Sequence, residues 1–148
     1  MIFSVDTNVL FYTIDRLSAE KRAMATMVMQ RMRELDCVLT TQVLGEFLAA
    51  VRRKNKAAFS DATVLVEGWS RTSAVANTTP ADLLNAAILA DRYKLQFWDS
   101  LILAVARSAD VSVMLTEDMQ DGATIDGVRL LNPFNPANRA ALDALLAP

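Results

Sequence analysis

Short apolar runs alternate along the chain with longer segments of helical periodicity, and this alternation constrains the fold more than any other sequence feature. The predicted strands span residues 2–5, 37–39, 73–76, 111–115 and 128–131, the last at a sheet edge, and the predicted helices span 8–14, 18–35, 40–54, 60–71, 80–93, 98–109 and 136–146. Strands that alternate with helices form mainly parallel sheets covered on both faces. We therefore predict an α/β fold with three α/β/α layers around a central, mainly parallel sheet of four or five strands.

Hydroxyl residues mark several of the predicted helix starts. Ser18, Thr40 or Thr41, Ser60 and Thr79 can each accept a hydrogen bond from the first turn of the helix that follows. Pro80 directly after Thr79 suits the first helical position, where its missing N–H costs nothing.

Length and composition favour one intracellular domain. The 148 residues contain no repeat or linker, and we expect a single domain over 1–148. Asp6, Asp15, Arg16 and Glu20 interrupt the first twenty residues, so we expect no leader or membrane segment and a cytoplasmic location. Cys37 has no partner for a disulfide and is predicted to be a buried structural thiol.

Histidine is absent, and its absence excludes whole classes of chemistry. A Ser/His/Asp triad, a Cys/His pair, a His-ligated zinc and RNA cleavage by paired imidazoles are all impossible. The net charge of −2 argues against a wholly basic surface that coats nucleic acid, but it permits a local basic patch. Acid–base or metal chemistry must therefore use carboxylates, lysines, tyrosines or the lone cysteine.

Four acidic residues fall at one edge of the predicted sheet. Asp6 ends the first strand, Glu46 lies early in the helix after the second, Asp99 begins the helix 98–109, and Asp118 closely follows the next strand. In open parallel sheets, ligands bind beyond the carboxyl ends of the strands. Crowded carboxylates in an apolar setting bind either protons or a cation, and an oxygen-only donor set favours Mg²⁺ or Mn²⁺.

Each acid also has a plain structural explanation. Asp6 and Asp99 can stabilise the helices that they begin. Glu46 can lie on an exposed helix face, and Asp118 can shape a turn. A coincidence of all four at one edge favours shared chemistry over four independent explanations.

The segments that contain these acids are SVDTNVL, TTQVLGEFLAAV, FWDSLILAVA, and LTEDMQDG followed by a strand that ends in LLNPF. In this order, over nearly the whole chain, they resemble the PIN domain family of metal-dependent ribonucleases, in particular the VapC-like toxins of VapBC-type toxin–antitoxin pairs. The resemblance implies that Asp6, Glu46, Asp99 and Asp118 form the catalytic and metal-binding cluster. Supporting polar groups would be Thr7, Asn8, Ser100 and Thr116, and Asp121 is the alternative to Asp118 as the final acid.

The resemblance also implies the reaction and the partners. We expect hydrolysis of RNA phosphodiester bonds with Mg²⁺ or Mn²⁺, a cognate antitoxin protein and a homodimer. The basic run Arg52, Arg53, Lys54 and Lys56 can track an RNA backbone or can simply be a solvated helix end. Methionines at helical spacing between residues 18 and 35 can pack in the core or receive a partner helix.

Two other functions compete with this interpretation. One is an aspartyl phosphoryl-transfer domain, although position 8 is Asn where an Asp-x-Asp pair would be expected. The other is a non-catalytic RNA- or protein-binding module that keeps a PIN-like fold without turnover.

Overall fold

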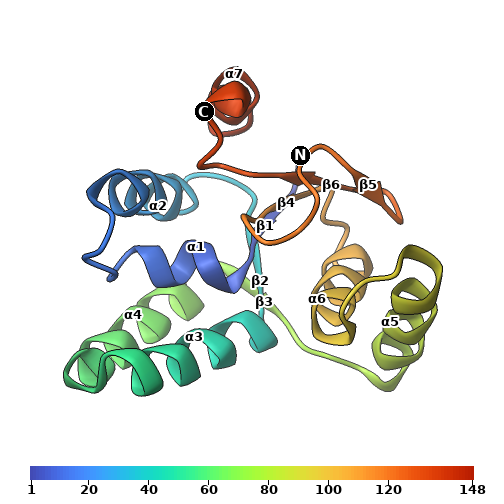
Figure 1. Ribbon diagram of the computed structural model, residues 1–148, viewed down its shortest axis with the longest axis horizontal. Helices are drawn as coiled ribbons and strands as arrows, with labels where there is room; N and C mark the ends of the chain where they lie inside the picture. The colour runs from blue at the N-terminus through green and yellow to red at the C-terminus, as the bar shows by residue number, and fades with distance from the viewer.

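Six strands lie at the centre of the computed structural model, which describes residues 1–148 (Figure 1). They are β1 (Phe3–Val5), β2 (Val38–Thr40), β3 (Ala74–Ala76), β4 (Val113–Leu115), β5 (Thr124–Ile125) and β6 (Val128–Leu131). Four of them form one sheet in the order β1-β4-β6-β5, with β1, β4 and β6 parallel and β5 antiparallel to β6. The prediction of a mainly parallel sheet is confirmed.

The two remaining strands extend this arrangement on the side of β1. Strands β2 and β3 pair in parallel, and a single parallel bridge between Phe3 and Cys37 joins β2 to β1. Because β1, β2 and β4 are parallel to one another, their carboxyl ends face the same edge of the molecule. Each of these three strands is followed there by a helix or a loop that carries polar residues.

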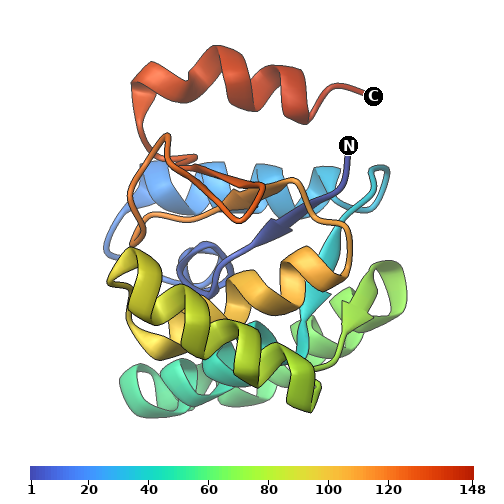
Figure 2. The same cartoon turned by 90° about the vertical axis from the view of Figure 1, so that its right-hand side faces the viewer.

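Helices cover both faces of the strands, as the three-layer prediction requires (Figure 1). They are α1 (Thr7–Tyr12), α2 (Ala19–Arg31), α3 (Thr41–Lys54), α4 (Phe59–Thr72), α5 (Pro80–Tyr93), α6 (Phe97–Ser108) and α7 (Arg139–Leu145). Helices α1 to α4 lie on one side, and α5 and α6 pack against each other on the other side. In Figure 2, α7 lies above these layers, and the two chain ends are on the same side.

The predicted caps are mostly correct. Ser18 and Thr40 cap α2 and α3 through their hydroxyl groups, and Thr79 forms a capping box with Asp82 at the start of α5. The cap predicted at Ser60 is wrong. Helix α4 begins at Phe59, directly after the 3₁₀ turn Lys56–Ala58, so its start needs no side-chain cap.

The edge position predicted for β6 is also wrong, because the two-residue strand β5 lies outside it. The turn between them consists of Asp126 and Gly127, whose φ angles of 49° and 82° are those of a tight hairpin. In the sequence, only the Asp126-Gly127 pair indicates this hairpin, because the strand before it, β5, is too short to show an alternating pattern.

The core lies between the sheet and the helices. Strands β1 and β4 are buried along their whole length, and Phe3, Val5, Met114 and Leu115 are at most 1% exposed. Cys37 is buried and free, as predicted, and burial raises the pKa of its thiol to about 12. No helix in the structure combines the length and the apolar character needed to cross a membrane.

Candidate active site

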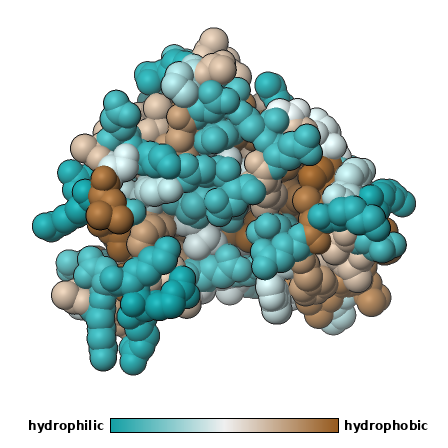
Figure 3. All heavy atoms as spheres, viewed as in Figure 1, coloured by the Kyte–Doolittle hydropathy of each residue, from teal (hydrophilic) through white to brown (hydrophobic).

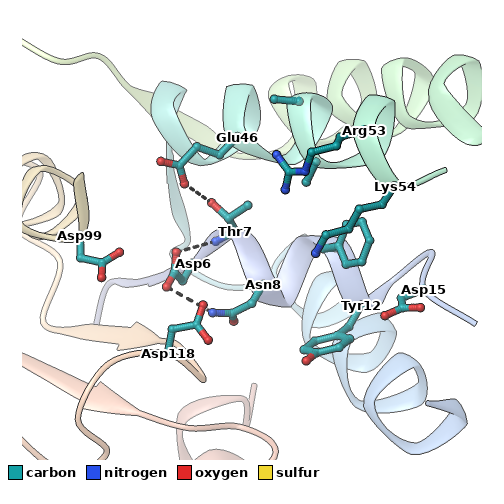
Figure 4. A pocket seen from close by; sticks show the side chains of 13 residues that line it. Asp6, Thr7, Asn8, Tyr12, Asp15, Glu46, Arg53, Lys54, Asp99 and Asp118 are labelled. Carbon is teal, nitrogen blue, oxygen red and sulfur yellow. Dashed lines mark hydrogen bonds between the residues drawn. The ribbon is translucent and has the colours of Figure 1, made fainter. Parts of the chain in front are cut away.

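A pocket of about 480 Å³ opens at the carboxyl ends of β1 and β4. Its lining comes from α1, α3, the start of α6 and the segment after β4 (Figure 4). The four acids predicted from the sequence all line it: Asp6, Glu46, Asp99 and Asp118. Residues that are up to 112 positions apart in the sequence therefore meet in one cavity, as the parallel topology predicts.

Asp6 is the most buried of these acids, with only 4% of its surface exposed. The parallel register places Val5 beside Leu115, so Asp6 lies next to Thr116. The Thr116 hydroxyl donates to Asp6 Oδ2 at 2.7 Å, and the Thr7 amide donates to Oδ1 at 2.7 Å. The Asn8 side chain donates to Oδ2 at 3.3 Å. Asp6 therefore caps α1 and also belongs to the pocket.

Burial raises the pKa of Asp6 to about 6, although the hydrogen bonds from Thr116 and Thr7 oppose this shift. The negative charges of Asp99 and Asp118 contribute smaller upward shifts to this pKa. A carboxyl that is costly to ionise without a positive partner is a common mark of a functional site.

Glu46 is held by donors from two directions. The Thr7 hydroxyl donates to Glu46 Oε2 at 2.6 Å, and Gln42 Nε2 donates to Oε1 at 2.8 Å. Gln42 Nε2 also donates to the backbone carbonyl of Trp98 at 3.0 Å. This amide therefore fixes Glu46 on α3 relative to the residue that precedes Asp99 on α6.

Asp99 and Asp118 complete the acidic end of the pocket. Asp99 lies in the first turn of α6, and its side chain points toward Asp6 (Figure 4). Burial raises the pKa of Asp99, and the charges of Asp118 and Glu46 add to the effect. The neighbouring charges therefore disfavour the ionised forms of Asp6 and Asp99, and a cation in the pocket would relieve this repulsion.

The donor set suits Mg²⁺ or Mn²⁺, because every candidate ligand is a carboxylate oxygen. In the arrangement described, no three acidic side chains approach a common point closely enough to enclose a metal ion. The match between this pocket and a divalent cation therefore rests on the shared pocket, the type of donor and the repulsion between the acids. Asp118, in the loop after β4, is exposed, whereas Asp6 is held by its hydrogen bonds to Thr116 and Thr7.

Asp121, the alternative final acid, lies outside the pocket. Its carboxylate accepts hydrogen bonds from the Asn132 amide at 2.9 Å and from the side chains of Asn135 and Asn138 at 2.8 Å. Burial raises its pKa, but these hydrogen bonds and that of the Gly122 amide lower it more, so the net pKa is below its usual value. Asp121 holds the segment after β6, and Asp118 is the acid in the pocket.

The other predicted residues divide into two groups. Thr7, Asn8, Arg53 and Lys54 line the pocket, and Thr116 contacts it through Asp6. Three others do not line it. Ser100 is buried and donates to the Gln96 carbonyl, Arg52 stacks on the Phe59 ring, and Lys56 is exposed in the 3₁₀ turn.

The structure adds residues that the sequence analysis did not assign to the site. Gln42 could have been found from its position one turn before Glu46, where two side chains on a helix meet. Tyr12 lines the pocket, and Lys21 contacts both its hydroxyl and Glu117. No local pattern signals this second contact, because Lys21 and Glu117 are 96 positions apart.

The fold and the pocket define an α/β domain that carries four acidic side chains at the carboxyl edge of a mainly parallel sheet. Residues 4–120 match the PIN domain model, and the chain belongs to the PIN domain family. No curated protein matches the chain in sequence.

Solved structures share this fold at low sequence identity. VapC20 from Mycobacterium tuberculosis, a sarcin-ricin loop cleaving toxin, has a TM-score of 0.62 and 19% identity over 80% of this chain and 90% of its own. VapBC2 from Rickettsia felis, bound to a promoter DNA fragment, has a TM-score of 0.65 and 14% identity; the match covers 89% of this chain and 98% of the chain from Rickettsia. PAE2754 from Pyrobaculum aerophilum has a TM-score of 0.67 and 17% identity; the match covers 100% of this chain and 97% of PAE2754.

Proposed function

We propose that this protein is an endoribonuclease that hydrolyses RNA phosphodiester bonds with Mg²⁺ or Mn²⁺, and that it is the toxin of a type II toxin–antitoxin pair. The observation that carries the proposal is the pocket in which Asp6, Glu46, Asp99 and Asp118 come together and the pKa values of Asp6 and Asp99 are raised. Membership of the PIN family and the fold shared with a toxin that cleaves RNA support it. We also propose a cytoplasmic location, because the proposed RNA substrate is a cytoplasmic molecule.

Asp6, Asp99 and Asp118 would hold the cation, with Glu46 beside them. When bound, the cation supplies a water of lowered pKa and neutralises charge on the phosphate. Thr116, Thr7 and Asn8 keep the Asp6 carboxylate in one orientation through the hydrogen bonds described above. Thr7 and Gln42 do the same for Glu46, whose remaining lone pairs can accept a proton or a hydrogen bond from water.

The proposal is tested by RNA cleavage with variants that remove one charge without changing side-chain size. We expect Asp99→Asn to lower the rate by at least about a hundredfold, because it removes a ligand that the reaction needs. Asp91→Asn removes a charge from an exposed position on α5, and we expect it to cleave like the wild type. EDTA should abolish cleavage, and added Mg²⁺ or Mn²⁺ should restore it.

Equal cleavage by wild type and Asp99→Asn, or cleavage that survives EDTA, would contradict the proposal. Tight RNA binding without cleavage under any metal condition would instead favour the non-catalytic module. These outcomes are distinguishable in one set of reactions.

We propose two protein partners, a cognate antitoxin and a second copy of the chain. A groove of about 710 Å³ between α2 and the segment after β6, lined in part by Met24, Met27 and Phe134, supports a site for an antitoxin segment. Figure 3 shows apolar side chains gathered over α5 and α6, where Leu84, Ile88 and Trp98 are at least 55% exposed. This surface supports the homodimer, and sedimentation of the protein alone at the monomer mass would argue against it.

A further inference from the structure

The acidic pocket has a second, chemically different end. Arg53, Lys54 and Tyr12 line the same cavity as the acids but lie on its opposite side (Figure 4). Phe11, which contacts Lys54, also lines the cavity. The ion pairs of the structure include neither Arg53 nor Lys54. Both cations are exposed and available to an anion that enters the pocket.

The spacing along α3 separates the two ends by a fixed distance. Glu46, Ala49, Ala50 and Arg53 occupy one face of the helix at positions i, i+3, i+4 and i+7, and all four line the pocket. Seven residues of helix rise by roughly 10 Å, so a ligand that spans both ends must be an extended molecule. The small alanine side chains between the ends leave room for it.

Two aromatic rings of α1, those of Phe11 and Tyr12, line the pocket at this end. Lys54 Nζ lies 4.7 Å from the centre of the Phe11 ring. The Tyr12 ring packs edge-on against Phe134 at a centroid distance of 5.0 Å. Lys21 Nζ lies 4.9 Å from the Tyr12 ring centre and donates to its hydroxyl at 3.3 Å. These contacts hold Tyr12 in place before any ligand arrives.

One carboxylate also lies at this end of the pocket. Asp15 accepts a hydrogen bond from the Leu17 amide at 3.0 Å and forms no ion pair with Arg53 or Lys54. The charge at this end therefore combines two unpaired cations with one acid that is engaged by the backbone. The other end has four acids and no cation.

We propose that Arg53, Lys54 and Tyr12 form a nucleotide subsite for single-stranded RNA beside the acidic cluster. Arg53 and Lys54 bind a phosphate that neighbours the scissile one, and Tyr12 stacks on an unpaired base of the same strand. A duplex is excluded as the preferred ligand, because its bases are already stacked on one another. This proposal rests on the proposed function for its ligand, RNA. It adds that the RNA is single-stranded and names the residues that bind it.

The test measures binding of a fluorescein-labelled, mixed-sequence, single-stranded RNA of about a dozen nucleotides in EDTA, at several salt concentrations. We expect Arg53→Ala and Lys54→Ala each to weaken binding and to reduce the slope of log K against log salt by about 0.7. Arg52→Ala is the matched control, because it makes the same change one position away, where the side chain stacks on Phe59 outside the pocket.

Tyr12 is tested with a pair of variants. Tyr12→Phe keeps the ring and should bind within about twofold of the wild type, whereas Tyr12→Leu removes the stacking surface and should bind about 5- to 100-fold more weakly. Thermal unfolding shows whether Tyr12→Leu is folded. If it is not, the comparison of Arg53→Ala with Arg52→Ala decides alone.

The subsite is overturned if Arg52→Ala weakens binding as much as Arg53→Ala, if folded Tyr12→Leu binds as tightly as Tyr12→Phe, or if an RNA duplex of the same sequence binds as well as the single strand. Cleavage plays no part in this measurement. A protein that never cleaves RNA can therefore still have the subsite, and a ribonuclease can lack it.

Discussion

At the scale of single residues, Asp6 shows how a structural role and a chemical role share one side chain. Its carboxylate caps α1 and accepts the Thr116 hydroxyl, yet burial raises its pKa to about 6. A residue selected only as a helix cap has no need of a raised pKa, because an exposed aspartate caps equally well. The raised pKa therefore points to the pocket that Asp6 lines rather than to the helix it begins.

The raised pKa of Asp6 predicts a gain of stability when its charge is removed. Because the folded protein binds the proton more tightly than the unfolded chain, the wild type loses stability as the pH rises from 3.8 to about 6. In EDTA at pH 8, we expect Asp6→Asn to unfold with a free energy up to about 3 kcal/mol higher than the wild type. Urea unfolding at several pH values measures this.

The same experiment contains its own control. Below pH 3.8 the wild-type carboxyl is protonated in both states, so the two proteins should become equally stable. An Asp6→Asn protein that is less stable than the wild type at pH 8 would contradict a destabilising charge at Asp6 and would mean that its hydrogen bonds outweigh the cost of burial.

The sequence was sufficient to find the residues whose neighbours along the chain define their place. Asp6 after a buried run, Glu46 among apolar residues and Asp99 at a helix start were all visible in short segments. Asp118 and Asp121 could not be separated in this way, because both lie in one short loop. Their separation depends on the Asn residues after β6, which hold Asp121 away from the pocket.

At the scale of elements, the contact between α5 and α6 depends on a buried charge. Asp82 is 3% exposed, closes the capping box with Thr79, and accepts the Ser108 hydroxyl of α6 at 2.7 Å. Burial raises its pKa, but the hydrogen bonds from Ser108 and Thr79 lower it more, so the net pKa is below 3.8. Since α6 carries Asp99, this contact also helps to place the site.

We expect Asp82→Asn to lower the free energy of unfolding by about 1 to 2 kcal/mol at pH 7, because it removes charge-assisted hydrogen bonds at a cap. The wild type keeps this stability above pH 3.8 and loses it as the pH falls through the lowered pKa, so the two proteins converge in acid. Asp91→Asn on the exposed face of the same helix is the control. Equal stability of Asp82→Asn and Asp91→Asn at pH 7 would contradict the assignment.

The elements themselves were largely predictable, and the misses have physical causes. Thr79 and Pro80 mark the start of α5 because both residues act locally. Strand β5 has two residues and a single partner strand, so its existence depends on the tight turn at Gly127 rather than on its own pattern. The cap expected at Ser60 was displaced by the 3₁₀ turn that leads directly into α4.

At the scale of the whole molecule, the parallel topology brings together residues that the chain keeps apart. The adjacent carboxyl ends of β1 and β4 hold Asp6 beside Thr116, and the helices that follow β2 and precede β4 add Glu46 and Asp99. Sequence patterns predicted this edge. The division of the pocket into an acidic end and a basic, aromatic end became visible only in three dimensions, because Arg53 and Lys54 lie on α3 whereas Tyr12 lies on α1.

The central claim is that these carboxylates jointly bind one or more divalent cations in the pocket. The most direct measurement is the anomalous difference map of a crystal grown or soaked with Mn²⁺. We expect a peak in the pocket within about 2.0 to 2.6 Å of oxygens of Asp6, Asp99 or Asp118, with the Asp118 segment moved inward to complete the site. A pocket without a peak at Mn²⁺ concentrations that support RNA cleavage, or a peak bound elsewhere on the chain, would contradict the account.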